Sequence, residues 1–393
     1  MERSRDSMND LLIVGGGPIG ATLALLLRDS GLSYRVLDAR RRGAPGLPDR
    51  TLALSYNARL LFERIGIWQK LESVSAIVAI EVSQKGGFGI TQMRAADVDV
   101  PALGYVIHYR ELQAALDSAL AASAIAVAHG CRVRTVKTAN GEALVDFDID
   151  ESTHDTSPAR AHLVVVADGS GEVLPELRRR TINYSQHAVV GYVECDAPHR
   201  GVAFERFTAD GPVALLPDGN GYALVWTATP ERAALLRVQH DADFLDALQQ
   251  HFGERVGGFT AVRGRNVFPL LLQFASSVTG ARWVALGNAA QALHPIAGQG
   301  FNLGLRDVWQ LAQVLTDASE AADDVGAVRV LDSYAKARRI DRWAGMLLTH
   351  GLVGMFATDR PLISGVRGLG LTLLDSIPPL KRALTRAMQN GIR

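Results

Sequence analysis

The sequence predicts an α/β protein in which a Rossmann-like dinucleotide-binding domain is interrupted by a β-sheet domain and followed by a helical C-terminal region. Residues 10–31 contain an apolar strand, a turn with G-x-G-x-x-G spacing and a helix, which is the pattern of a dinucleotide-binding unit. Residues 181–272 change to β-rich segments, with a helical insertion near 230–251. Residues 283–307 return to a strand, a glycine-rich turn and a helix, so we expect the first domain to be discontinuous.

The length of the chain, 393 residues, favours two closely packed domains. We expect the dinucleotide-binding domain to occupy residues 8–180 and 273–340, the β-sheet domain residues 181–272, and the helical C-terminal region residues 341–393. The β-sheet domain then lies between two segments of the first domain, where its inner face would form the wall of a substrate site.

Composition excludes several classes of function. The 41 basic and 41 acidic residues balance, which argues against a nucleic-acid surface. Cys131 and Cys195 lie far apart, in no metal-ligand spacing, so we expect no metal and two buried thiols in a reducing compartment. The charged N-terminal residues lack the apolar core of a signal peptide, and we expect a cytoplasmic protein.

The first glycine turn has the spacing that a bound pyrophosphate requires. Gly15 permits the tight turn, Gly17 lets the pyrophosphate approach the backbone, and Gly20 lets the helix pack closely on the strand. Asp38 ends the next strand, about 20 residues on, where a carboxylate binds ribose hydroxyls. The alternative for Asp38 is a strand-end turn residue, but the order of strand, turn, helix, strand and carboxylate favours the ribose role.

The second glycine turn follows a buried strand that begins at Trp283. Several glycines and a proline then follow within residues 287–300, and the sequence predicts that a helix starts at Asn302. The N-terminus of such a helix favours negative charge, which makes the joint a second candidate for ligand binding. The constrained positions are Gly287, Pro295, Gly298 and Gly300.

This second segment resembles the FAD-binding signature of group A flavoprotein monooxygenases, written G-D-x-A-H, proline and G-x-G-x-N. Asn288 and Gln291 stand where most of that family carry Asp and His, and the run LHPIAGQGFNLGLRD is similar to the ubiquinone-biosynthesis hydroxylases, in particular the 2-polyprenyl-6-methoxyphenol hydroxylase branch. The resemblance implies the fold of para-hydroxybenzoate hydroxylase, with FAD in the interrupted domain. An Asn amide at position 288 can still donate and accept hydrogen bonds to a ribitol hydroxyl.

The resemblance also assigns residues to the cofactor site. The family's arginine that faces the flavin maps to Arg50, for which a solvated loop arginine is the alternative. The family's pyrophosphate-binding arginine maps to Arg110, for which a helix-capping or surface arginine is the alternative. The A-D-G motif keeps Asp168 and Gly169 but lacks its later serine and arginine, which weakens its nicotinamide half. The implied FAD-binding residues are Gly15, Gly17, Gly20, Asp38, Arg50, Arg110, Asp168, Gly169, Gly287, Asn288, Pro295, Gly298, Gln299, Gly300 and Asn302.

The function that this resemblance implies is an FAD-dependent monooxygenase of ubiquinone biosynthesis. It would use NAD(P)H and O2, through a flavin C4a-hydroperoxide, to hydroxylate a polyprenylated phenol, converting 2-polyprenyl-6-methoxyphenol to the 1,4-benzoquinol. A phenol reacts faster as the phenolate, and the candidates for its base are His294, Tyr192, Tyr222 and His187, none of which the sequence singles out. The alternatives are a non-catalytic flavin-fold subunit of a quinone-biosynthesis assembly, and an FAD enzyme acting on another aromatic substrate.

The C-terminal tail after Gly351 is rich in Leu and Ile and carries Lys381, Arg382 and Arg386. Packing against the core is the favoured interpretation for most of it. A surface for other ubiquinone-biosynthesis proteins and a peripheral contact with the inner membrane are the alternatives.

Overall fold

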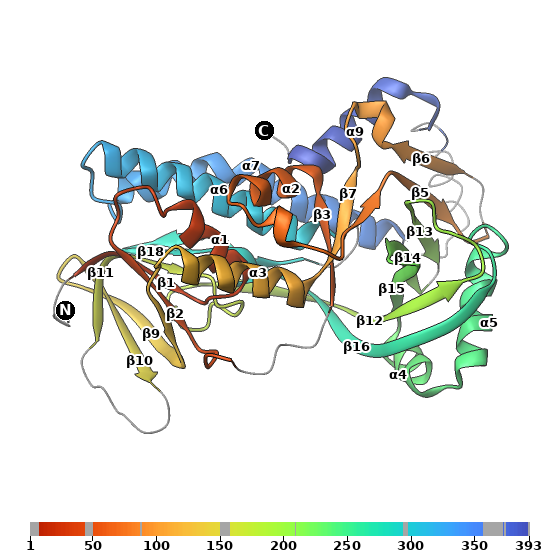
Figure 1. Ribbon diagram of the computed structural model, residues 1–393, viewed down its shortest axis with the longest axis horizontal. Coiled ribbons are helices and arrows are strands. Elements are labelled where there is room, and N and C mark those ends of the chain that lie inside the picture. The colour runs from red at the N-terminus through yellow and green to blue at the C-terminus, as the bar shows by residue number, and fades with distance from the viewer. Residues whose placement is uncertain are drawn as a thin grey trace.

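The computed structural model describes residues 8–43, 50–86, 89–149, 158–208, 210–293, 298–356, 372 and 375–391. Two eight-stranded sheets lie towards opposite ends of the long axis of the molecule, and a three-stranded sheet lies between them (Figure 1). The predicted α/β class with a separate β layer is therefore confirmed. The domain boundaries stay a prediction.

The first sheet carries the dinucleotide-type unit. Its β1 strand is parallel to both β11 and β2, and the residues from Leu11 to Val14 are buried, as expected for a strand covered on both faces. Its strands, in spatial order, are β17 (Thr279–Gly280), β18 (Trp283–Ala285), β11 (Ala159–Val166), β1 (Asn9–Val14), β2 (Tyr34–Asp38) and β8 (Val127–His129), with β10 (Glu142–Ile149) on β11 and β9 (Cys131–Ala139) on β10.

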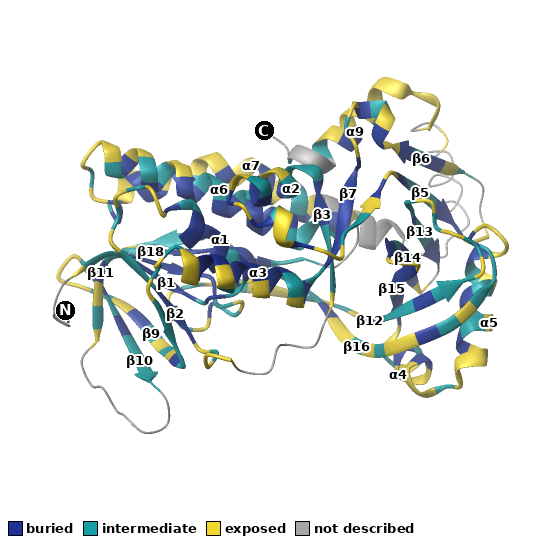
Figure 2. Cartoon of the chain, in the orientation of Figure 1, coloured by how far each residue is buried: buried dark blue, intermediate teal, exposed yellow. Residues whose placement is uncertain are grey.

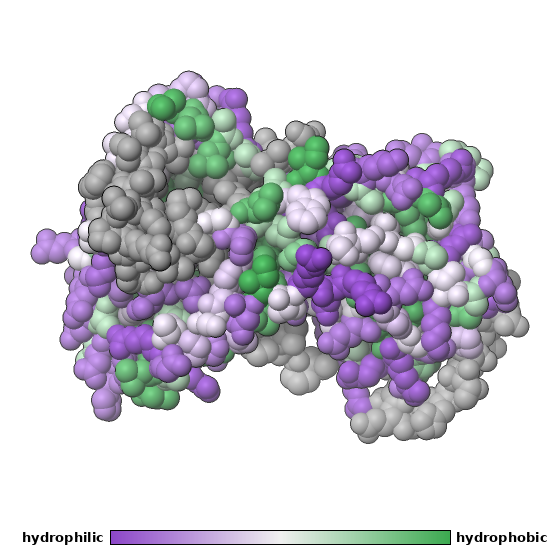
Figure 3. All heavy atoms as spheres, turned by 180° about the vertical axis from the view of Figure 1, so that it is seen from behind, coloured by the Kyte–Doolittle hydropathy of each residue, from purple (hydrophilic) through white to green (hydrophobic). Residues whose placement is uncertain are grey.

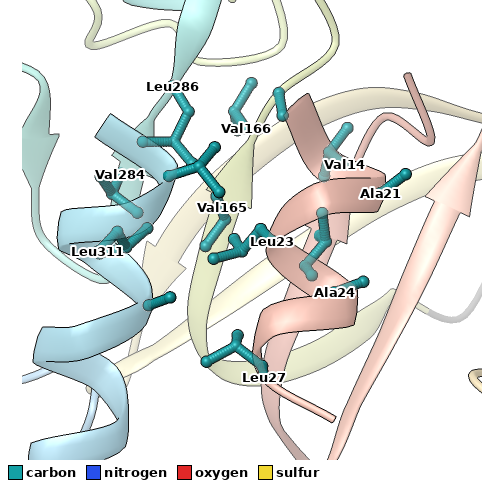
Figure 4. Packing of buried hydrophobic residues seen from close by; sticks show 14 of the residues in the cluster. Val14, Ala21, Leu23, Ala24, Leu27, Val165, Val166, Val284, Leu286 and Leu311 are labelled. Carbon is teal, nitrogen blue, oxygen red and sulfur yellow. The ribbon is translucent and has the colours of Figure 1, made fainter. Parts of the chain in front are cut away.

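Helices pack on this sheet through apolar faces. Leu23 of α1 (Pro18–Leu26) and Leu311 of α6 (Gln299–Glu320) point towards Val165 of β11 (Figure 4). The predicted stripe of Leu112, Leu116 and Leu120 on α3 (Tyr109–Ala122) is buried, so its core role is confirmed. Helix α7 (Val328–Phe356) packs on α6, and Figure 2 shows exposed residues along its outer side.

The second sheet has its own hydrophobic core on the face that α4 and α5 cover. Its Val189, Leu215 and Trp226 form a separate core with α4 (Pro230–Val238) and α5 (Asp241–Phe252), which confirms the predicted helical insertion. Its strands, in spatial order, are β19 (Gln291–Ala292), β16 (Phe259–Ala275), β12 (Arg179–Cys195), β15 (Gly221–Ala228), β14 (Gly211–Asp218), β13 (Val202–Thr208), β5 (Ala79–Gln84) and β6 (Ile90–Arg94).

This sheet draws strands from outside the range predicted for it. Strands β5 and β6 come from residues assigned to the first part of the dinucleotide-binding domain, and β19 comes from the second part. Because β5 pairs in parallel with β13, about 120 positions later in the sequence, the pairing is non-local and leaves no local signature.

The small central sheet joins the two larger ones. It consists of β3 (Thr51–Ser55), β7 (Gly104–His108) and β4 (Ser75–Ile77). Helix α2 (Tyr56–Arg64) follows β3, and α9 (Pro378–Asn390) packs against α2 and the short helix η2 (Ala95–Val98). The remaining short helices are η1 (Trp68–Lys70) and η3 (Gly287–Ala289).

Both cysteines are free thiols. Cys131 is buried and Cys195 is half-buried, and burial raises the pKa of each thiol to about 11. Neither therefore has the character of a reactive thiolate. Within the part of the chain that the structure describes, no helix is both long and apolar enough to cross a bilayer.

Candidate flavin site

The three glycines of the first turn differ in why the structure has glycine at each position. Gly15 has φ of +103°, and a Cβ there would lie 2.6 Å from the carbonyl oxygen of Ala167, while a Cβ on Gly20 would collide with the Gly15 carbonyl oxygen. Gly17, by contrast, is the extended N-cap of α1, with φ of −64° and ψ of 178°, and a Cβ there would meet no heavy atom within 4 Å. The protein itself therefore requires Gly15 and Gly20, whereas Gly17 leaves open space at a helix N-terminus.

Asp38 lies directly against this turn and is held by Arg40. Its carboxylate accepts hydrogen bonds from the Arg40 backbone N at 3.1 Å, Nε at 2.9 Å and Nη2 at 2.6 Å. Nη2 also donates to the Gly16 carbonyl at 2.8 Å, and the Gln113 amide donates to the same oxygen at 3.0 Å. Sequence reasoning missed Arg40 and Gln113, although an arginine two residues after the strand-end carboxylate is a visible signal.

The Asp168 segment packs onto the first turn. Because a Cβ on Gly15 would lie 2.9 Å from the Asp168 Cα, the two motifs are in contact. The Asp168 carboxylate accepts hydrogen bonds from the hydroxyl of Ser170 at 2.7 Å and from the backbone N of Gly171 at 2.8 Å. Gly169 is exposed, with φ of +82°. Asp168 thus orders its own turn beside the glycines.

The second turn meets the first through one side chain. Ile19 of α1 packs against Gly287, where a Cβ would lie 3.0 Å from Ile19 Cγ1, and against Gly304 of α6. Asn288 is exposed beside this contact. The structure therefore brings the two glycine turns together, whereas His294 and Pro295 lie outside the described residues.

The start of α6 differs from the prediction. The helix begins at Gln299, not at Asn302, because Gly298 adopts a left-handed conformation with φ of +60° and turns the chain into the helix. Gly298 also packs closely on β3, since a Cβ there would lie 2.8 Å from the Ala53 Cβ. Gly300 therefore lies in the first turn of α6, where a Cβ would make only ordinary contact with Leu293 at 3.8 Å.

The Asn302 side chain links α6 to β3 by hydrogen bonds. Its side-chain Nδ2 donates to the carbonyls of Ala53 and Gly298, both at 2.9 Å, and its Oδ1 accepts from the backbone N of Ser55 at 2.8 Å. The residue is 4% exposed. These bonds support a positioning role for the Asn302 side chain, and the predicted contact with FAD stays a proposal.

Arg50 contacts the buried Tyr109, and Arg110 follows Tyr109 in the sequence. The Arg50 guanidinium lies 4.7 Å from the ring centroid of Tyr109, and the Arg50 carbonyl accepts a hydrogen bond from the Tyr109 backbone N at 2.8 Å. Arg110 is exposed at the second position of α3. The structure therefore places the Arg50 guanidinium against Tyr109, and the predicted phosphate contact of Arg110 stays a prediction.

An apolar pocket lies between α6, the central sheet and the second sheet. Its empty space is about 480 Å³, a volume that includes open solvent at its mouth. Its lining residues are Ala53, Leu54, Ser55, Ile77, Ile80, Met93, Leu103, Gly104, Gln299, Asn302 and Thr385. Sequence reasoning missed the lining from residues 77–104, whose alternating apolar residues in β5 and β6 were the available signal.

None of the described candidates for a phenol base lines this pocket. Tyr222 is buried in the core under α4 and α5, and burial raises its pKa far above the usual range. His187 lies on that same face of β12, two residues from the buried Val189. Tyr192 reaches the β14–β15 turn, where its hydroxyl lies beside Gly221. The structure therefore assigns no base.

The residues present fit FAD. Gly17 leaves space for a pyrophosphate at the N-terminus of α1, Asp38 offers a carboxylate at the strand end, and the apolar pocket begins at the N-terminus of α6. The two glycine turns, which meet at Ile19, are the segments that would hold FAD.

Comparison with known proteins agrees with this fit. The sequence model of the FAD binding domain matches residues 8–346. Ubiquinone hydroxylase UbiL of Rhodospirillum rubrum is 34% identical over 98% of this chain and 90% of its own length, and 3-demethoxyubiquinol 3-hydroxylase of Escherichia coli is 28% identical over 95% and 96%. The structure of p-nitrophenol 4-monooxygenase PnpA from Pseudomonas putida DLL-E4 shares the fold, with a TM-score of 0.78, 17% identity and coverage of 98% of this chain and 99% of that one.

The match to the FAD binding domain and the similarity to a hydroxylase over nearly the whole chain identify an FAD-dependent monooxygenase. Within that class, the chain belongs to the ubiquinone-biosynthesis FAD hydroxylase family, since its similarity to UbiL extends over nearly its whole length. Flavin hydroxylases of this kind typically use NAD(P)H as the reductant.

Proposed function

We propose that this protein hydroxylates a polyprenylated phenol in ubiquinone biosynthesis, with NAD(P)H as the electron donor. One oxygen atom of O2 enters the ring and the other leaves as water, and NAD(P)H supplies the two electrons that balance the reaction. Bound FAD would supply the oxygen activation, and the protein would supply the position of the ring and the exclusion of water. The 1,4-benzoquinol of 2-polyprenyl-6-methoxyphenol is the product that we propose.

The observation that carries this proposal is the lining of the apolar pocket. No Arg, Lys or His lines it among the described residues, and its wall is formed by side chains such as Ile77, Ile80, Met93 and Leu103. A hydroxybenzoate would bring a carboxylate that needs a cation or several donors in such a place. A neutral phenol with an isoprenoid tail needs neither, and each buried methylene gains about 0.8 kcal/mol.

Affinity is therefore expected to increase with the number of isoprene units. The measurement is binding and product analysis over a series of phenols with no tail, one unit and several units, with flavin reduction by NADH and NADPH followed anaerobically before oxygen is added. Equal turnover of untailed phenols would contradict the prenyl assignment and leave the monooxygenase intact. Bound FAD with no hydroxylation of any phenol would instead favour a non-catalytic subunit.

The proposed substrate is lipid-like, and α9 offers a surface suited to a membrane. Ile377 and Leu380 are 42% and 50% exposed, Arg382 and Arg386 are exposed beside them, and Thr385 of the same helix lines the pocket. Hydrophobic surface is visible at the upper left of Figure 3, in the region of α9 and β6. We propose a peripheral contact there, because apolar residues with flanking arginines suit an anionic bilayer surface.

Substitution Leu380→Glu is expected to reduce cosedimentation with vesicles that contain phosphatidylglycerol, since it places a charge at the centre of this surface. Leu235→Glu is a matched control, because Leu235 is 52% exposed on α4, in the second sheet's outer layer. Equal effects of the two substitutions would remove α9 as the contact.

A further inference from the structure

Gln291 lies where the second sheet meets the flavin-binding segment. It forms the two-residue strand β19 with Ala292, and β19 is the end strand of the sheet, paired with Gln273 and Phe274 of β16. The residue is 4% exposed. Its backbone therefore belongs to the second sheet, although it lies directly before the glycine-rich sequence that leads to α6.

The side chain of Gln291 connects two helices. Its Nε2 donates to Asp307 Oδ2 of α6 at 2.6 Å, and its Oε1 accepts from Arg342 Nε of α7 at 2.6 Å. Gln291 precedes the glycine-rich segment and Asp307 follows it, so the first bond joins the two flanks of that segment directly.

The partners of Gln291 are themselves fixed. Asp307 is fully buried and accepts from Arg338 Nε at 2.6 Å, and Arg338 also binds Asp341, which binds Arg306. The network consists of Arg306, Asp307, Arg338 and Asp341. It anchors one end of the Gln291 amide to the interface between α6 and α7.

Arg342 anchors the other end. Its Nη2 donates to the Ala275 carbonyl of β16 at 3.1 Å, and the described part of the chain offers it no carboxylate within ion-pair distance. The amide of Gln291 is therefore the side-chain acceptor that holds this guanidinium. Arg342 therefore links α7 to β16 of the second sheet and to Gln291.

We propose that Gln291 is a positioning residue for the flavin, whose amide sets the position of α6 relative to the second sheet. An amide suits this place because it carries a donor and an acceptor without charge, and it meets a carboxylate on one side and a guanidinium on the other. A neutral imidazole also has one donor and one acceptor, which agrees with the histidine found at this position of the family signature. The inference depends on FAD binding and not on the identity of the phenol.

The decisive variant is Gln291→Leu, which keeps the volume and removes both hydrogen bonds. We expect the dissociation constant of FAD, measured by titration of the apoprotein, to rise at least tenfold, and the visible absorption bands of the bound flavin to shift. Gln291→His is expected to restore most of the affinity and the parental spectrum. Should the leucine variant fail to fold, Gln291→Asn serves instead, since its amide is too short to reach both partners.

The matched control is Gln249→Leu on α5. Gln249 also bridges with its amide, accepting from the Phe259 backbone N at 3.0 Å and donating to the Gly257 carbonyl at 3.0 Å, but it lies in the outer layer of the second sheet. We expect this substitution to lower the melting temperature of the apoprotein and leave FAD binding unchanged. Parental FAD affinity and spectrum in Gln291→Leu, or equal losses in both variants, would overturn the proposal.

Discussion

Replacing Gly17 with valine is expected to remove FAD from a protein that still folds. In the apoprotein the new side chain meets no heavy atom within 4 Å of its Cβ, and the φ and ψ of −64° and 178° are allowed for valine. The side chain would instead occupy the space where the pyrophosphate must approach the backbone. We expect FAD affinity to fall by a factor on the order of a hundred or more, or about 2.8 kcal/mol.

The measurement is flavin absorbance per protein after desalting, together with thermal unfolding of the apoprotein. Valine is a poorer N-cap than glycine, so the apoprotein is expected to lose about 1 kcal/mol. Gly351→Val is the matched control, because Gly351 is exposed in α7 and a Cβ there also meets nothing within 4 Å. Normal flavin content in Gly17→Val would show that the first glycine turn does not receive the pyrophosphate.

The largest loss of stability is expected from Arg338→Met. Arg338 is 8% exposed and binds two carboxylates, those of Asp307 and Asp341, which are 1% and 7% exposed. Removing the guanidinium leaves both charges buried with fewer partners, a change that costs about 3–5 kcal/mol. Equilibrium unfolding in urea measures this loss.

Arg160→Met provides the comparison. The Arg160 side chain is 58% exposed in its ion pair with Glu142, and such pairs contribute about 0–1 kcal/mol. If Arg338→Met lowers the free energy of unfolding no more than Arg160→Met does, the buried network does not stabilise the interface between α6 and α7.

The stability of the folded protein is expected to depend on pH through Asp341. Burial alone would raise the pKa of its carboxyl, but the guanidiniums of Arg306 and Arg338 outweigh burial and hold the pKa below its usual range. A carboxyl with a lowered folded-state pKa adds stability that is fully present above the unfolded pKa of about 3.9 and is lost as the pH falls through the folded pKa. The difference in stability between the parent and Arg338→Met should therefore narrow below about pH 4.

Local patterns were enough to predict the elements that carry the proposed flavin-binding residues. Strand, glycine turn and helix depend on neighbouring residues, and the geometry agrees with the tight turn predicted at Gly15 and the close packing predicted at Gly20. The pyrophosphate role of Gly17 stays a prediction. The start of α6 was predicted three residues late, because a left-handed glycine can cap a helix and the sequence pattern does not reveal its conformation.

Long-range contacts could not be predicted in the same way. Asn302 has a sequence pattern typical of a cofactor contact, yet its side chain binds the backbone of β3 about 250 positions earlier. The pairing of β5 with β13 likewise joins distant segments, so the apolar wall of the pocket was missed. Such contacts depend on how the sheets assemble, and a single sequence carries no direct record of that assembly.

The second sheet is built from three separated stretches of chain, and this limits how the protein can be divided. A segment excised at residues 181–272 would lack β5 and β6 beyond one edge and β19 beyond the other. Both newly exposed strands, β13 and β16, would present unpaired backbone groups and would invite aggregation. A chimera that exchanges substrate specificity between relatives must therefore carry residues 79–94 and 291–292 along with the central block.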